Sequence, residues 1–206
     1  CPKSYHCIDC EFDQYFHDQF KVHAVLKPVG FEDISGISLP NGYYLHPGHV
    51  WVKIEDQGMV RLGIDDFACR LLGKFDGVSS HLTGEKLEQG RSIATLYRQK
   101  NKVSFTSPVT GIITEVNPRV HNTPSLINQA PYTDGWLFMA YCPGLKQNLK
   151  QLLFMETSKN FMGRQVEQLY AFLEQETQLR AADGGSLVSD IFGNLPGISW
   201  EVLTNK

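Results

Sequence analysis

Residues 49–64 read HVWVKIEDQGMVRLGI, and this stretch predicts the first element of the fold. Apolar residues at positions 50, 52 and 54 recur with a period of two, which is typical of a strand. Gly58 then provides a turn, and residues 59–64 form a second run rich in apolar side chains. We therefore expect the two runs to pair as a β-hairpin.

A short helix is expected directly after this hairpin. Asp65 or Asp66 can cap its first turn, because a side-chain carboxylate accepts hydrogen bonds from the free backbone N–H groups there. Gly73 is a typical helix end. The apolar face of this helix would comprise Phe67, Leu71 and Leu72.

A second hairpin is expected where residues 93–98 and 103–105 alternate around the sequence Gln-Lys-Asn-Lys at 99–102. Asn101 is one of the few non-glycine residues that tolerates the left-handed conformation of a tight turn. Lys100 then lies at the tip of this hairpin. Residues 111–116 form a further β-branched run, so the middle of the chain is expected to be mainly β.

Residue composition and apolar periodicity divide the chain into three parts. Residues 1–40 mix cysteine, histidine, acidic and aromatic residues and form an N-terminal extension, and residues 41–144 form the β domain. Residues 145–206 form a helical extension, in which an apolar stripe between 162 and 173 repeats at three- and four-residue spacing. We expect this stripe to pack on the β domain, with a homodimer or partner helix as the alternative.

The composition excludes several classes of protein. Of the 206 residues 42% are hydrophobic and 20% are charged, which excludes general disorder. No apolar run approaches the ~20 residues of a membrane-spanning helix, and a net charge of −3 indicates no nucleic-acid or anionic-membrane partner. Five cysteines, an odd number in a chain of this length, indicate a reducing, cytoplasmic setting. Because the chain starts at Cys1 without Met, it is expected to be a fragment.

Several motifs, occurring in the same order, resemble the glycine cleavage system H-protein family. They are HVWV at 49–52, LGIDDFA at 62–68, LG at 72–73, SPVTG at 107–111, TEVN at 114–117, LIN at 126–128 and GWL at 135–137. The resemblance covers roughly residues 45–162.

The resemblance implies a mainly β fold with α extensions, a biotinyl/lipoyl-like flattened barrel followed by C-terminal helices. It also implies a carrier and not an enzyme. In this family lipoate is joined by an amide bond to one lysine at a hairpin tip. Its dithiolane takes an aminomethyl group from glycine decarboxylase to an aminomethyltransferase, and dihydrolipoyl dehydrogenase then reoxidises the dithiol. These three enzymes are the partners that the resemblance implies.

Lys100 occupies the carrier position that the resemblance implies, and the expected hairpin places the same residue at its tip. A carrier lysine needs an exposed amine on a stiff tip, so that only the long arm moves. The flanks differ from the family motif Glu-Ser-Val-Lys-Ala, because residues 97–101 read Tyr-Arg-Gln-Lys-Asn and Arg98 and Lys102 make the tip basic. A lipoylated carrier lysine and an ordinary solvated turn lysine therefore both stay open. A biotin carrier is disfavoured because the Met-Lys-Met signature is missing.

The N-terminal extension contains a candidate metal site. Cys7 and Cys10 form a CxxC pair with Cys1 nearby, and thiolates at this spacing suit tetrahedral zinc. An iron–sulfur cluster, a redox pair and inert thiols are the alternatives. We expect aromatic residues between positions 12 and 20 to anchor this segment on the β domain in place of a metal. Cys69 and Cys142 are expected to be small buried hydrophobes.

The sequence contains no phosphate-binding glycine loop, nucleophile-elbow serine or paired-carboxylate signature, which agrees with a non-catalytic carrier. His49 is expected to orient the first strand through a hydrogen bond. Two rival functions stay open. One is an interaction or scaffold module that kept the fold and lost the lipoyl arm, and the other is a small redox or metal protein that docks through the β domain.

Overall fold

The computed structural model describes residues 30–177, 189–195 and 197–204, whose strands form three antiparallel sheets. The largest sheet has the order β12-β3-β4-β5-β11-β10-β7. Its strands are β3 (Tyr44–His46), β4 (Val50–Ile54), β5 (Met59–Ile64), β7 (Lys86–Leu87), β10 (Gly111–Val116), β11 (Phe138–Tyr141) and β12 (Leu153–Phe154). A three-stranded sheet contains β6 (Gly77–Ser80), β8 (Ser92–Arg98) and β9 (Asn101–Thr106), in that order, and a ribbon contains β1 (Phe31–Ile34) and β2 (Ile37–Pro40).

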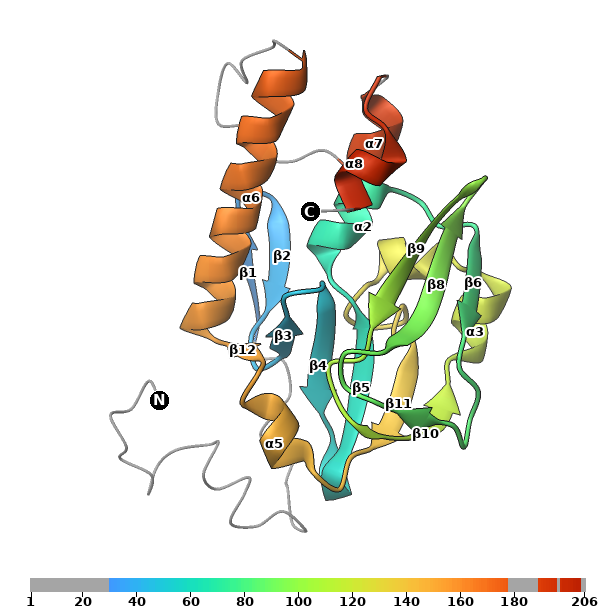
Figure 1. The fold of residues 1–206 in the computed structure, drawn as a ribbon. Coiled ribbons are helices and arrows are strands. Elements are labelled where there is room, and N and C mark those ends of the chain that lie inside the picture. Colours follow the sequence, from blue (N-terminus) through green and yellow to red (C-terminus); the bar gives the residue numbers. More distant parts are fainter. Residues whose placement is uncertain (1–29, 178–188, 196, 205–206) are drawn as a thin grey trace.

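The helices lie mostly outside these sheets. They are α2 (Asp66–Leu72), α3 (Pro118–Asn122), α4 (Leu126–Gln129), α5 (Leu145–Leu149), α6 (Glu156–Thr177), α7 (Ile191–Asn194) and α8 (Trp200–Thr204), with a 3-10 turn at Asp56–Gly58. Figure 1 shows the long α6 along one side of the molecule beside β1 and β2, with α7 and α8 next to α2. In the described part of the chain, no helix has the length and hydropathy to cross a bilayer.

The first predicted hairpin is confirmed, and a tryptophan locks it. β4 and β5 pair in a register that sets Trp51 opposite Gly63. The Trp51 ring is buried, and its Nε1 donates to the carbonyl oxygens of Ile64 and Pro131, each at 3.1 Å. A Cβ at position 63 would lie 2.5 Å from the Trp51 ring, so only glycine fits beneath it.

The short helix after this hairpin is confirmed as α2. The Asp65 carboxylate accepts from the Ala68 N–H at 2.9 Å and so caps the first turn. Gly73 ends the helix with a φ of 73°, a conformation that glycine adopts without strain. Of the predicted apolar face, Phe67 and Leu72 are buried in the core, and Leu71 is partly buried against it.

The apolar stripe of the long C-terminal helix packs within the chain. Met162, Val166 and Leu169 on α6 are all buried in the same core as the β-strands. The expectation that the stripe serves the protein's own core is therefore confirmed.

Part of the predicted N-terminal extension is described, namely the β1–β2 ribbon. Ile37 on β2 is fully buried, and the Ser38 N–H donates to Asp66 Oδ2 at 2.8 Å. Glu32 on β1 pairs with Lys159 on α6 at 2.8 Å. The boundaries 1–40, 41–144 and 145–206 stay a prediction, because contact alone does not say whether each part folds by itself.

Candidate functional site

The second predicted hairpin is present, with a tighter turn than expected. β8 and β9 pair out to Arg98 and Asn101, which leaves only Gln99 and Lys100 in the turn. The positive φ of 54° falls on Gln99, whereas Asn101, expected to be the left-handed residue, lies in β9. Lys100 is exposed at the tip, and Lys102 is in the returning strand.

The tip is held by the residue that precedes β6. Asp76 accepts a hydrogen bond from the Gln99 N–H through Oδ2 at 2.6 Å, and the Asp76 N–H donates to the Tyr97 carbonyl oxygen at 3.0 Å. A two-residue turn locked in this way has little freedom. Lys100 is thus an exposed amine on a stiff tip, which is what a carrier lysine requires.

The residues that flank Lys100 lie in different environments. Tyr97 and Lys102 are cross-strand partners, and both are exposed. Arg98 is only 14% exposed and forms an ion pair with Asp190 at 2.5 Å. Counting Arg98 toward a basic tip is therefore wrong, because an acid 92 residues further along the chain compensates its charge.

A largely apolar cavity of about 440 Å³ lies beside β9. Its walls come from α2, α6, α8, β9 and the loop at 47–49, and among its apolar residues are Leu71, Phe105, Phe172 and Leu203. Five residues bring polar side chains to the wall: His49, Ser104, Gln165, Gln168 and Thr204. Such a cavity can hold an apolar chain and orient it through a few hydrogen bonds.

His49 connects this cavity to the core. Its Nδ1 lies 2.8 Å from Asp65 Oδ2, and its ring stacks on Phe67 with centroids 4.8 Å apart. Asp65 is fully buried and also caps α2, so one carboxylate links the start of β4 to the helix. The prediction that His49 orients the first strand by a hydrogen bond is confirmed.

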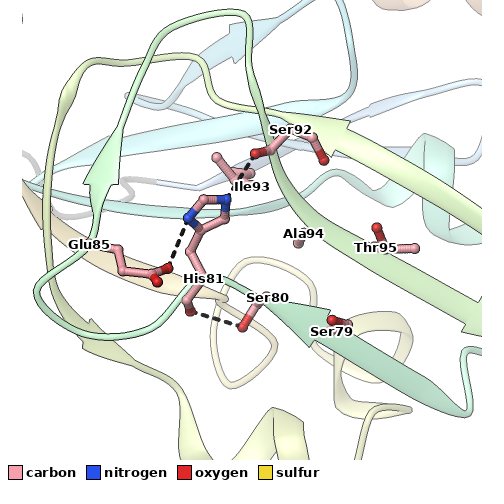
Figure 2. A pocket seen from close by; sticks show the side chains of 8 residues that line it. All are labelled: Ser79, Ser80, His81, Glu85, Ser92, Ile93, Ala94 and Thr95. Atoms are coloured by element: carbon pink, nitrogen blue, oxygen red, sulfur yellow. Dashed lines mark hydrogen bonds and ion pairs between the residues drawn. The ribbon is translucent and has the colours of Figure 1, made fainter.

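A second hollow, of about 310 Å³, is polar and lies over β6 and β8 (Figure 2). His81 points into it, with Nδ1 3.0 Å from Glu85 Oε2 and Nε2 3.2 Å from the Ser92 carbonyl oxygen. The hollow is lined by the first residues of β8, from Ser92, whereas Lys100 follows the other end of that strand. The hollow and the hairpin tip are therefore separate sites. Within the ranges described, no three His, Cys, Asp or Glu side chains gather as a metal site.

The cysteines divide into two groups. Cys1, Cys7 and Cys10, the candidate metal ligands, lie outside the described residues. Cys69 and Cys142 are buried, as predicted. Burial raises the pKa of the Cys69 thiol well above its usual range and that of Cys142 to about 12, so neither is a ready thiolate nucleophile.

Sequence reasoning found the hairpin tip but missed two features around it. The cavity is lined by residues that lie far apart in the sequence, from Pro47 to Thr204, and no local sequence motif predicts that they meet. The partner of Arg98 lies in a short C-terminal piece whose only local signal is the N-cap residue Asp190.

Comparison with known proteins gives consistent matches. The family model of the glycine cleavage H-protein matches residues 43–165, which is more than half of the chain. The glycine cleavage system H protein of Coprothermobacter proteolyticus is 34% identical over 115 residues, which are 56% of this chain and 90% of that protein. The probable glycine cleavage system H protein 2 of Saccharolobus solfataricus is 39% identical over 106 residues, which are 50% of this chain and 72% of that protein.

A solved structure shows the same likeness in three dimensions. The crystal structure of a glycine cleavage system H protein from Mycobacterium marinum matches with a TM-score of 0.54 and 27% identity, over 62% of this chain and 99% of that chain. The open, antiparallel sheets fit the predicted flattened barrel with added helices. By sequence and by fold, this chain belongs to the glycine cleavage H-protein family.

Proposed function

We propose that this chain is a lipoyl carrier and not an enzyme, with lipoate joined to Lys100 by an amide bond. The observation that carries the proposal is the position of Lys100, an exposed lysine in a two-residue turn at the tip of the β8–β9 hairpin. Membership of the H-protein family supports a carrier role.

The residues present fit the attachment chemistry. The unprotonated Lys100 amine attacks the carboxyl carbon of an activated lipoate, the new N–C bond forms, the activating group leaves, and a proton passes to solvent. The exposed cross-strand pair beside the tip is Tyr97 and Lys102, and the acidic side chain at the turn, Asp76, is hydrogen-bonded to the Gln99 N–H. Amide formation removes one positive charge, which lowers the cost of placing the arm against apolar surface.

The cavity beside β9 would receive the apolar arm between encounters with partner enzymes. Val103 and Ser104 on its wall lie three and four residues after Lys100, on the strand that leaves the tip. Leu71 and Phe172 would contact the hydrocarbon chain, and His49 would supply a polar contact. When attached, the dithiolane supplies the thiol chemistry that carries a group from one enzyme to the next.

By family, the proposed partners are glycine decarboxylase, an aminomethyltransferase and dihydrolipoyl dehydrogenase, in the cytoplasm. The outer face with Tyr97 and Lys102 is open to them, because both side chains are exposed. A homodimer is not part of the proposal, since the α6 stripe is buried within the chain.

The test is the mass of the protein isolated from its native host. We expect the Lys100 peptide to carry the mass of a lipoyl or octanoyl amide and Lys102 to be free, because Lys102 lies within β9 and not in the turn that presents Lys100. The matched variants are Lys100→Arg, which should abolish the modification, and Lys102→Arg, which should not. The acyl group on Lys102 would overturn the site, and an unmodified chain in lipoate-replete cells would favour a scaffold module that has lost its arm.

A further inference from the structure

A C-terminal piece of the chain, residues 190–204, contacts both strands of the carrier hairpin close to Lys100. This piece lies beyond residues 43–165, which the family model matches. Figure 1 shows its two short helices, α7 and α8, beside α2 and the β8–β9 hairpin. Ile191, Trp200 and Leu203 are its buried anchors.

The first contact is a two-pronged ion pair at Arg98, two residues before Lys100. Arg98 Nη1 and Nη2 donate to Asp190 Oδ1 and Oδ2 at 2.5 and 2.9 Å, and Nη1 also donates to the Leu72 carbonyl oxygen at 2.6 Å. The guanidinium lies over the Phe192 ring, 5.1 Å from its centroid. Arg98 is 14% exposed and pairs with Asp190 through two parallel hydrogen bonds. A bidentate pair of this kind has a better defined geometry and a larger interaction energy than a single ion pair on the open surface.

Three residues at the ends of two helices, α2 and α7, are arranged around this ion pair. Asp190 has a φ of 67° and also accepts from the Gly193 N–H at 2.7 Å, which caps α7. A Cβ at Gly73 would clash with Arg98 Nη1, and one at Gly193 would lie 2.5 Å from Asp190 Oδ2. A larger residue at either glycine would displace the charged groups, so the observed ion pair depends on glycine at the end of α2 and in the turn of α7.

The second contact is on the other strand, two residues after Lys100. Trp200 Nε1 donates to the Lys102 carbonyl oxygen at 2.8 Å. β9 is the edge of its sheet, and through this bond α8 covers part of the open edge. Trp200 is buried and packs edge-on against Phe192, which joins the two contacts.

We propose that Arg98 is a positioning residue for Lys100, and that the 190–204 segment braces the carrier hairpin from both strands so that the lysine is presented in one direction. This proposal rests on the proposed lipoyl-carrier function. Its consequence is that the segment stays docked while an acylating enzyme acts, and that the enzyme approaches from the Tyr97 and Lys102 face.

The test perturbs the brace at Asp190 and leaves the residues around Lys100 unchanged. Asp190→Asn keeps an oxygen that can cap α7 but loses the charge, and Asp190→Arg sets two guanidinium groups against each other. The matched controls are Asp134→Asn and Asp134→Arg, at the exposed ion pair of Asp134 with Arg119, 2.6 Å apart. Each variant is made in the full chain, and its fold is checked by circular dichroism.

Two measurements are made on each variant. The first is amide hydrogen exchange of residues 96–104 in the unmodified protein, which we expect to be roughly tenfold faster in Asp190→Arg, with a smaller rise in Asp190→Asn. The second is acylation of Lys100 with lipoate, ATP and a lipoate–protein ligase. If the docked fraction falls to about one fifth, the KM for the carrier rises about fivefold and kcat holds. The Asp134 variants should match the wild type in both measurements.

Unchanged exchange in Asp190→Arg would overturn the brace, and a lower KM would show that the segment obstructs the enzyme and does not position the lysine. If the ligase fails to acylate even wild-type Lys100, the proposed function fails, and hydrogen exchange alone then decides whether the brace exists.

Discussion

The packing of Trp51 over Gly63 predicts a coupled pair of substitutions in the core. A Cβ at position 63 would lie 2.5, 2.6 and 2.8 Å from Cζ2, Cε2 and Nε1 of Trp51. Gly63→Ala should therefore destabilise the protein by about 1–3 kcal/mol, the range for an overpacked core. Trp51→Phe should cost about 2–4 kcal/mol, because it removes an indole N–H shared by two carbonyl oxygens and leaves a cavity.

The loss of stability in the double variant should be much smaller than the sum of the losses in the two single variants. Of the three Trp51 atoms that clash with the new methyl group, Cζ2 belongs to the outer ring that phenylalanine lacks. The smaller phenylalanine ring can also shift away from the positions of Nε1 and Cε2, so the methyl can occupy the vacated space. We expect a coupling free energy of at least about 1 kcal/mol in favour of the double variant.

The assay is urea unfolding at one temperature, followed by far-ultraviolet circular dichroism because the tryptophan signal itself changes. The control is Gly163→Ala on α6, where a new Cβ meets no atom within 4 Å and the variant should gain about 0.5–1 kcal/mol. Additivity of the two core substitutions within about 0.5 kcal/mol would refute the steric reasoning.

The remaining predictions concern pH and the N-terminal part. Burial and the neighbouring charge of His49 lower the pKa of His46, whose Nδ1 accepts from the Gly48 N–H at 2.9 Å. Neutral His46 contributes its full stabilisation above the unfolded pKa of about 6.5, and this contribution is lost as the pH falls below that value. The wild type should therefore lose more stability than His46→Gln between about pH 7.5 and 5.5, and equal losses would argue against this. A chain that starts at residue 41 should keep a cooperative thermal transition, at a lower midpoint than one that starts at residue 30, because it lacks the buried Ile37; loss of cooperativity would place the ribbon in the core domain. A strong chelator should leave the protease protection of residues 1–25 unchanged, whereas release of zinc or iron together with new cleavage there would assign Cys7 and Cys10 to a metal site.

The local elements were predictable because their signals are local. The alternation at 50–54 and 59–64 became β4 and β5, and the Asp65 cap with the Gly73 stop became the bounds of α2. The turn at 99–102 was predicted too long, because Asn101 has a strong intrinsic preference for left-handed turns. Pairing of Asn101 with Arg98 and the bond from Gln99 to Asp76 override that preference.

The sequence by itself determined the hairpins, the capped helix, the family motifs and Lys100 at a turn, because each follows from residues within a few positions of one another. Only the tertiary structure decided what surrounds that lysine. The cavity is a shape formed by five separate parts of the chain, and the partner of Arg98 lies 92 residues away. Contacts of this kind depend on how elements pack after they form, and neither periodicity nor spacing carries that information.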